Sequence, residues 1–583
     1  MASNRILERI CVRHWRAGLA SSTALVAFFC VGAYAQDNRI IVAPGETLTI
    51  SGQTINAAGN QSVYGVRVNG PGSSFTGSDL TINVESTTSS FGSPSAGLSN
   101  WGGMSSTTGS VYSLSGTHTY GLHANGNATR VITMSSTNDT ITTEGDFGFG
   151  VFAYSVATGG SSTVTLNGSS IATGGINAYG LLAQGVNTSI TANGLSVETD
   201  GASAIGAYAA GGSIGLAGSE ITTRGQGAYG AYAGIGGEIA ITGGTINTGG
   251  DRGYGLYSTG AGSAINASDL AISTSSDWTF GAYATDEGAI TLDGGSITTS
   301  GERAIGILAS TGGTINSSAN VTTTGAMAHG IQSGENAAGD SGTVTLTGGM
   351  ISTGGNDAFG LHALATGTIS ATGDVVVSTT GVNGFGAFAE SDSSISLDGT
   401  KIRTTGANGF GLLVNNDRST TGGRIVANNA DVRTTGAGAE AARIENGGEM
   451  TISNSRLETQ KAAGIALVNN ATVTLTNTEI ASSRETITSV LNQNGQTQNV
   501  NVGDGTVATA NNGTLLKVSR TGDGSTGVVN LILGAGSTTQ GDIVDEGTTT
   551  TGGTDVTLEE GAAWTGLLRG VRNFTGFEGG DVN

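Results

Sequence analysis

Ser341 is the residue whose setting comes nearest to that of a catalytic nucleophile. Residues 339–342 read Gly-Asp-Ser-Gly, and a serine in such a segment can attack a carbonyl when a histidine takes its proton. Residues 343–346 continue, however, as an ordinary alternating strand, and His329 occupies a repeat position instead of a separate catalytic segment. We therefore predict that the chain has no catalytic residue.

Two glycine patterns could in principle hold a nucleophile or a phosphate. Residues 211–215 fit Gly-x-Ser-x-Gly, and residues 522–527 fit Gly-x-Gly-x-x-Gly. Both chemistries need the pattern at a turn between a strand and a helix, and neither segment has that context. With 101 glycines in 583 residues, chance matches are expected, so we predict no cofactor site.

Metal ligands and clustered charges are equally sparse. Both cysteines, Cys11 and Cys30, fall in the N-terminal segment, and the Gly-Asp-Gly runs lack the tandem nonapeptide of a calcium-binding roll. Lysines occur only at Lys401, Lys461 and Lys517, and the acidic residues lie mostly at expected turns. No aligned Asp/Glu column of the kind needed to cleave glycans is visible, so we predict neither a metal site nor an enzyme.

Aromatic residues form the best candidate for a binding surface. A ring recurs at one position of successive repeats, at Tyr208, Tyr232, Tyr257 and Tyr283, and again at Phe388. Strand periodicity places these rings on the outer face of a strand, where they form a stripe. The stripe either stacks for structural reasons or binds a glycan or a protein, and both interpretations are open at this stage.

The stripe belongs to a repeat of about 25 residues that runs through most of the chain. A short motif recurs in which an aromatic or aliphatic residue is followed by glycine, for example at residues 179–180, 229–230, 254–255 and 385–386. Each repeat holds three short stretches of alternating polarity separated by Gly, Asn, Asp and Ser. This pattern predicts an all-β fold, a right-handed parallel β-helix with three strands per coil.

In the first strand of each repeat, alternation predicts which side chains fill the interior. Tyr229, Ala231 and Ala233 share one face, and we expect that face to point inward. One large buried side chain contributes about 1.5–3 kcal/mol, whereas fixing each backbone residue costs about 1–2 kcal/mol. A single coil is therefore unstable, and stacking of coils must stabilise the fold.

The repeats suggest boundaries along the chain. Coils are expected over residues 36–485 and again over residues 513–583. Residues 85–117, rich in Ser, Thr and Gly, break the period and are predicted to form an excursion. Residues 486–512 are predicted to be a second irregular segment.

Residues 1–35 have the features of a signal peptide. Arg5, Arg9, Arg13 and Arg16 precede a mostly apolar run, and small residues end the segment, so we expect cleavage after Ala35. The remaining chain would contain no cysteine, and it would be more acidic than the −21 of the full chain. Such a surface repels phosphate backbones, which argues against nucleic-acid binding.

These features, together with residues 556–566, which read Val-Thr-Leu-Glu-Glu-Gly-Ala-Ala-Trp-Thr-Gly, resemble the pertactin-like passenger regions of classical autotransporters. The resemblance spans nearly the whole chain after the signal segment. It implies export to the cell surface, outer membrane or extracellular space through an outer-membrane β-barrel. No barrel-type strands follow Trp564, so the resemblance implies a translocator supplied in cis or in trans.

We therefore expect an exported, non-enzymatic surface or secreted passenger that acts in adhesion, autoaggregation or host contact. Its partner would be a protein or glycan on a host or neighbouring cell. Three alternatives are an extracellular polysaccharide-active β-helix enzyme, a purely structural surface layer, and a truncated, nonfunctional passenger fragment.

Overall fold

The computed structural model describes residues 38–582 except 61, 88–89, 91, 127–128, 156–158, 336–340, 417–421, 523, 548–551 and 577–580. The predicted signal segment and its cleavage after Ala35 lie outside the described residues. Within the described part, no helix is long and apolar enough to cross a membrane. Among the described residues, the one helical element is a short 3-10 turn, η1 (Gly524–Thr526).

The strands form three faces, each a stack of parallel strands. The first face contains β1 (Ile40–Val42), β4 (Tyr64–Val68), β7 (Ser95–Asn100), β10 (Thr119–Gly126), β13 (Phe149–Ser155), β16 (Tyr179–Gln184), β19 (Ile205–Ala210), β22 (Tyr229–Gly234), β25 (Tyr254–Thr259), β28 (Phe280–Thr285), β31 (Ile305–Ala309), β34 (Ile331–Ser333), β37 (Leu361–Ala363), β40 (Ala387–Glu390), β43 (Leu412–Asn415), β46 (Ala442–Glu445), β49 (Ile465–Val468), β52 (Ile487–Leu491) and β59 (Leu568–Arg569).

The second face contains β2 (Thr47–Ser51), β5 (Ser74–Ser78), β8 (Gly103–Thr108), β11 (Val131–Thr137), β14 (Ser161–Asn167), β17 (Thr188–Asn193), β20 (Ser213–Ala217), β23 (Glu238–Thr242), β26 (Ala264–Ser268), β29 (Ala289–Asp293), β32 (Thr314–Ser317), β35 (Thr343–Leu346), β38 (Thr368–Thr372), β41 (Ser394–Asp398), β44 (Arg424–Asn428), β47 (Glu449–Ser453), β50 (Thr472–Thr476), β53 (Thr497–Val502), β55 (Val528–Leu533), β57 (Gly553–Leu558) and β60 (Asn573–Gly576).

The third face contains β3 (Thr54–Gly59), β6 (Thr81–Ser86), β9 (Val111–Ser115), β12 (Thr140–Thr143), β15 (Ser170–Thr173), β18 (Ser196–Thr199), β21 (Glu220–Thr223), β24 (Thr245–Thr248), β27 (Ala271–Thr274), β30 (Ser296–Thr299), β33 (Asn320–Thr323), β36 (Met350–Thr353), β39 (Val376–Thr379), β42 (Lys401–Thr404), β45 (Asp431–Thr434), β48 (Arg456–Thr459), β51 (Glu479–Ser482), β58 (Ala563–Thr565) and β61 (Asp581–Val582). Two long strands, β54 (Val507–Arg520) and β56 (Thr538–Asp545), run from the third face into the first.

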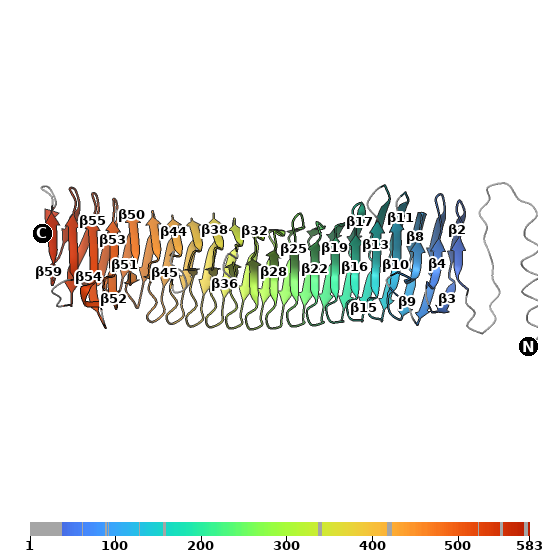
Figure 1. Ribbon diagram of the computed structural model, residues 1–583, viewed down its shortest axis with the longest axis horizontal. Coiled ribbons are helices and arrows are strands. Elements are labelled where there is room, and N and C mark those ends of the chain that lie inside the picture. Colours follow the sequence, from blue (N-terminus) through green and yellow to red (C-terminus); the bar gives the residue numbers. More distant parts are fainter. Residues whose placement is uncertain are drawn as a thin grey trace, which may run out of the picture.

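Each coil pairs with the next through all three of its strands. Tyr229 of β22 pairs with Tyr254 of β25 on the first face, and Ile239 of β23 pairs with Ile265 of β26 on the second. The arrangement is a right-handed parallel β-helix of about 19 turns, which confirms the predicted fold. At roughly 4.8 Å per coil, the stack makes a rod about 90 Å long, and Figure 1 shows this elongated shape.

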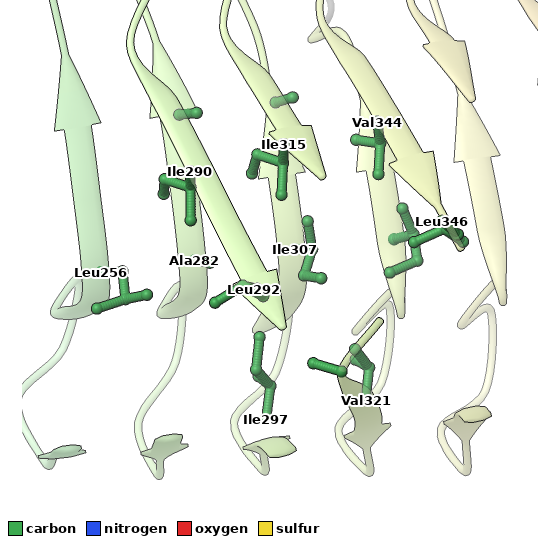
Figure 2. Close-up of a cluster of buried hydrophobic side chains, with 14 of the residues drawn as sticks. Leu256, Ala282, Ile290, Leu292, Ile297, Ile307, Ile315, Val321, Val344 and Leu346 are labelled. Carbon is green, nitrogen blue, oxygen red and sulfur yellow. The ribbon is translucent and has the colours of Figure 1, made fainter. Parts of the chain in front are cut away.

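The interior is an aliphatic core to which all three faces contribute. Figure 2 shows Leu256 and Ile307 from the first face, Ile290 and Ile315 from the second, and Val321 from the third. These side chains are at most 1% exposed. On the second and third faces alternation puts every second residue of a strand inside, as in β23 and β24, so each coil stacks its aliphatic side chains on those of its neighbours.

A buried threonine closes the corner that leads from the third face into the first. The Thr323 hydroxyl donates a hydrogen bond to the Ala328 carbonyl oxygen at 2.6 Å, and Thr379 does the same to Gly384 at 2.6 Å. Thr434 donates to Ala439 at 2.6 Å. In these coils the bond fixes the turn that precedes the first-face strand, so it sets where that strand begins. Within the part of the chain that the structure describes, the equivalent hydroxyls of Thr199, Thr223 and Thr248 make no such bond.

Two predicted irregular segments are instead part of the stack. Within residues 85–117, β7, β8 and β9 pair in parallel with the coils on both sides. Residues 486–512 contain β52, β53 and the beginning of β54, which also pair with their neighbours. The predictions of an excursion and an irregular segment are wrong for these strands, because backbone pairing tolerates the polar side chains that weakened the sequence pattern.

Candidate binding surface

The four predicted tyrosines form a continuous stack on the outside of the first face. Tyr208, Tyr232, Tyr257 and Tyr283 lie on β19, β22, β25 and β28, which pair in register. Their ring centroids are 4.4, 5.0 and 5.4 Å apart in that order. Each ring is partly exposed, whereas the alternating neighbours Ala231 and Ala233 of β22 are fully buried in the core. We call this position the trailing row.

A second row of aromatic residues, which the sequence placed inside, also lies on the outer surface. Tyr229 is partly exposed, and its ring centroid is 5.9 Å from that of Tyr232 in an edge-to-face arrangement. Tyr229 stacks in turn on Tyr254, with ring centroids 5.0 Å apart. We call this position, directly before the repeat glycine, the leading row. The prediction that Tyr229 points inward with Ala231 is wrong.

Gly230 explains the outward position of Tyr229. A Cβ atom on Gly230 would lie 2.3 Å from the Ile246 Cγ2 atom and 2.6 Å from the Gly255 carbonyl oxygen. Gly230 therefore faces inward at the place where strict alternation would put Tyr229. As a result Tyr229 lies on the outer surface beside Tyr232, and the two rings are on the same side of the strand. The same arrangement recurs at Gly386, whose Cβ would lie 2.3 Å from Ile402 Cγ2.

Both rows continue into a second section with different chemistry. His329, Phe359, Phe385 and Phe410 form the leading row there, with successive ring centroids 4.6, 4.8 and 5.0 Å apart. His362 and Phe388 form the trailing row, with centroids 5.3 Å apart. We call these six residues the histidine section, and Tyr208, Tyr229, Tyr232, Tyr254, Tyr257, Phe280 and Tyr283 the tyrosine section.

The trailing row is less accessible in the histidine section. His362 is 7% exposed and Phe388 is 8% exposed. The His362 Nε2 atom lies 3.0 Å from the Glu390 Oε1 atom, and the His329 Nδ1 atom accepts a hydrogen bond from the Phe359 N–H at 3.1 Å. Phe388 therefore lies in the predicted stripe, yet it is buried, whereas the four tyrosines are partly exposed.

A third group of outer rings, in the earlier coils, is buried. Tyr120 is 0% exposed, Phe149 is 3% exposed and Phe152 is 4% exposed, and together with their neighbours they form a hydrophobic cluster separate from the core. The tyrosine section thus lies between this buried cluster and the buried trailing row of the histidine section.

Near each end of the first face an arginine lies over an aromatic ring. The Arg67 guanidinium lies 5.0 Å from the Tyr64 ring centroid and 4.9 Å from that of Trp101. Near the other end, the Arg443 guanidinium lies 5.1 Å from the Phe410 ring centroid. At Phe410, the last ring of the leading row, the cation–π contact covers the ring face that stacking leaves open.

The tyrosine hydroxyls remain neutral at ordinary pH. Burial among the neighbouring rings raises the pKa of Tyr208, Tyr232, Tyr257 and Tyr283 above the usual tyrosine range. The Tyr283 hydroxyl lies 3.1 Å from the Ser310 Oγ atom. Since stacking covers the ring faces, the section presents ring edges and neutral hydroxyl groups to a partner.

The fold and these rows define the chain as a parallel β-helix with an outer double row of aromatic side chains. No protein-family model and no curated protein matches it. Among solved structures, a chain of the cryo-EM structure of the Vag8–C1 inhibitor complex is similar at 20% sequence identity, with a TM-score of 0.32. That match covers 93% of this chain and 98% of the other.

Proposed function

We propose that the chain is an exported, non-enzymatic surface or secreted passenger that contacts a host or neighbouring cell through the tyrosine section, in adhesion or autoaggregation. The partner is a protein or a glycan on that cell. An outer-membrane β-barrel, in cis or in trans, delivers the passenger. The signal-like segment at residues 1–35, the absence of cysteine after it and the acidic composition support this proposal.

One observation carries the proposal, namely the stacked and partly exposed set Tyr208, Tyr232, Tyr257 and Tyr283. Tyrosine is enriched at contact surfaces because it combines a large rigid ring with a polar end. Stacking holds each ring in place, so little side-chain entropy is lost when a partner binds. A rod about 90 Å long would hold this surface away from the cell that bears it.

The test is attachment of cells that display a Tyr232→Ser, Tyr257→Ser double variant. We expect attachment to fall about tenfold or more, since buried tyrosines at interfaces often contribute 2 kcal/mol or more. The matched control is Glu238→Ala with Asn266→Ala, because both residues are exposed on the second face of the same two coils.

Surface labelling of intact cells and the thermal unfolding midpoint must accompany the attachment assay. Attachment that stays unchanged in a folded, displayed double variant would contradict the binding role of the tyrosine section. Absence of surface label on the wild-type chain would contradict export.

A further inference from the structure

A shallow cleft lies on a different face and nearer the beginning of the chain than the tyrosine section. It runs across β3, β6, β9 and β12 on the outside of the third face, with a volume of about 460 Å³. In most later coils the third-face strand has four residues, whereas β3 and β6 have six and β9 has five. The longer strands give this part of the third face a second outward row.

Pairing places the cleft residues in two parallel rows along the rod. One row is Asn56, Asn83, Ser113 and Thr142. In the other row Ala58 pairs with Glu85 and Glu85 with Ser115, and Glu144 lies beside Ser115 because Thr143 pairs with Leu114. Two carboxylates thus flank one hydroxyl, an alignment that the sequence analysis did not find.

The polar groups of the cleft are largely without partners inside the protein. Asn83 Nδ2 donates to Asn56 Oδ1 at 2.8 Å. The side chains of Glu85, Ser115 and Glu144 make no hydrogen bond or ion pair among the described residues, and both glutamates are exposed. No basic or aromatic side chain belongs to the described lining. The cleft therefore offers carboxylate, amide and hydroxyl oxygens and no positive charge.

We propose that this cleft binds a linear glycan that carries no negative charge, either neutral or bearing amino groups. Coils repeat at roughly 4.8 Å and the two rows lie roughly 7 Å apart, so the array offers polar partners at regular steps along an extended chain. Unpaired carboxylates accept hydrogen bonds from sugar hydroxyls and attract ammonium groups. They repel uronate or sulfated chains, because nothing in the lining neutralises them.

The cleft binds without cleaving. Glycoside hydrolysis needs one carboxyl group held protonated, and enzymes achieve this by placing it in apolar surroundings. Glu85 and Glu144 are both exposed, so neither has such surroundings. The site is independent of the tyrosine section, and its test needs no cell attachment.

The test measures binding of oligosaccharides to the purified protein by calorimetry. The probes are oligomers of glucose, of N-acetylglucosamine, of glucosamine and of galacturonate, with calcium ions alone as a further probe. Ser113→Trp fills the middle of the cleft. Its matched control is Ser273→Trp, because Ser273 is an exposed serine at the same outward position of a later third-face strand, β27.

We expect at least one neutral or amino oligomer to bind, galacturonate oligomers not to bind, and Ser113→Trp to abolish binding while Ser273→Trp leaves it unchanged. Glu85→Gln with Glu144→Gln should weaken binding about tenfold, the usual effect of losing a charged hydrogen-bond partner. The proposal is overturned if no neutral or amino oligomer binds, if galacturonate binds as well as they do, if Ser113→Trp binds normally, if calcium alone accounts for the heat, or if new reducing ends appear.

Discussion

The tyrosine section and the histidine section have the same backbone geometry, but their trailing rows differ in accessibility. Both place one row before the repeat glycine and the other three residues later, and both stack their rings about 5 Å apart. In the first the trailing-row rings end in hydroxyl groups and are partly exposed, whereas in the second His362 and Phe388 are buried. The comparison shows that one ladder can be structural in one part of the rod and available for contact in another.

The largest expected difference between the two sections is the loss of stability when one trailing-row ring is removed. Phe388→Ala should lower the free energy of unfolding by about 3 kcal/mol, since it empties a buried ring site, and the partly exposed Tyr232→Ala by about 1 kcal/mol. Urea unfolding followed by fluorescence and circular dichroism measures both values. Equal losses would mean that the two sections do not differ in burial.

The repeat glycine should be equally important in both sections. We expect Gly230→Ala and Gly386→Ala each to lower the free energy of unfolding by about 1–3 kcal/mol. The new methyl group would meet an isoleucine side chain and, in the next coil, a backbone carbonyl oxygen. Gly215→Ala is the control, since a Cβ there has no neighbour within 4 Å. A tolerated alanine at either repeat glycine would contradict the geometry that turns the leading row outward.

Acidification should destabilise the histidine section and leave the stability of the tyrosine section unchanged. Burial, and then the neighbouring His362, hold the pKa of His329 well below its usual value of about 6.5. As the pH falls, the unfolded chain therefore takes up this proton before the folded chain does. The contribution of neutral His329 to the free energy of unfolding is complete above about pH 6.5 and falls by about 1 kcal/mol for each pH unit below it.

Hydrogen exchange of β34 and β37 against β22 and β25 at pH 7.5 and 5.5 measures that difference. His329→Asn is the informative variant, because its Oδ1 atom can still accept the Phe359 N–H but does not titrate. Equal acid sensitivity of wild type and variant would exclude His329 as the cause.

Alkaline conditions should destabilise the tyrosine section, by less than acid destabilises the histidine section. Burial raises the pKa of its tyrosines, so the unfolded chain loses these protons first and stability falls as the pH rises above about 10. The rings are partly exposed, so we expect less than about 1 kcal/mol per ring. Ultraviolet titration of native and urea-unfolded protein should show later ionisation in the native state, and coincident curves would contradict this.

The sequence predicted the coil but not every side-chain direction. A period of about 25 residues with three alternating stretches was sufficient for the three faces, and the trailing-row tyrosines were placed correctly on the outside. Tyr229 was misplaced because alternation assumes one inward site in every two residues, whereas Gly230 adds another. The close approach of the next coil shows that no side chain fits at position 230, and this approach is visible only in the structure.

The cleft on the third face could not be predicted for a different reason. Glu85 and Glu144 lie in different coils, and their alignment depends on the exact length of the turns between them. The connection from Glu85 to Ser115 lies within residues 85–117, whose composition hid the strands β7, β8 and β9. Register between coils is a property of backbone pairing, which side-chain types specify only weakly.

The pairing of each strand with its counterpart in the next coil also determines how the rod comes apart. Among the residues that the structure describes, the strand ladders join each coil to its immediate neighbours, and none joins one end of the rod to the other. Unfolding can therefore proceed coil by coil from an end, and a folded stretch can serve as the template on which the next coil is laid down. A chain emerging through a narrow opening could fold progressively in this way, each new coil held by the one before it.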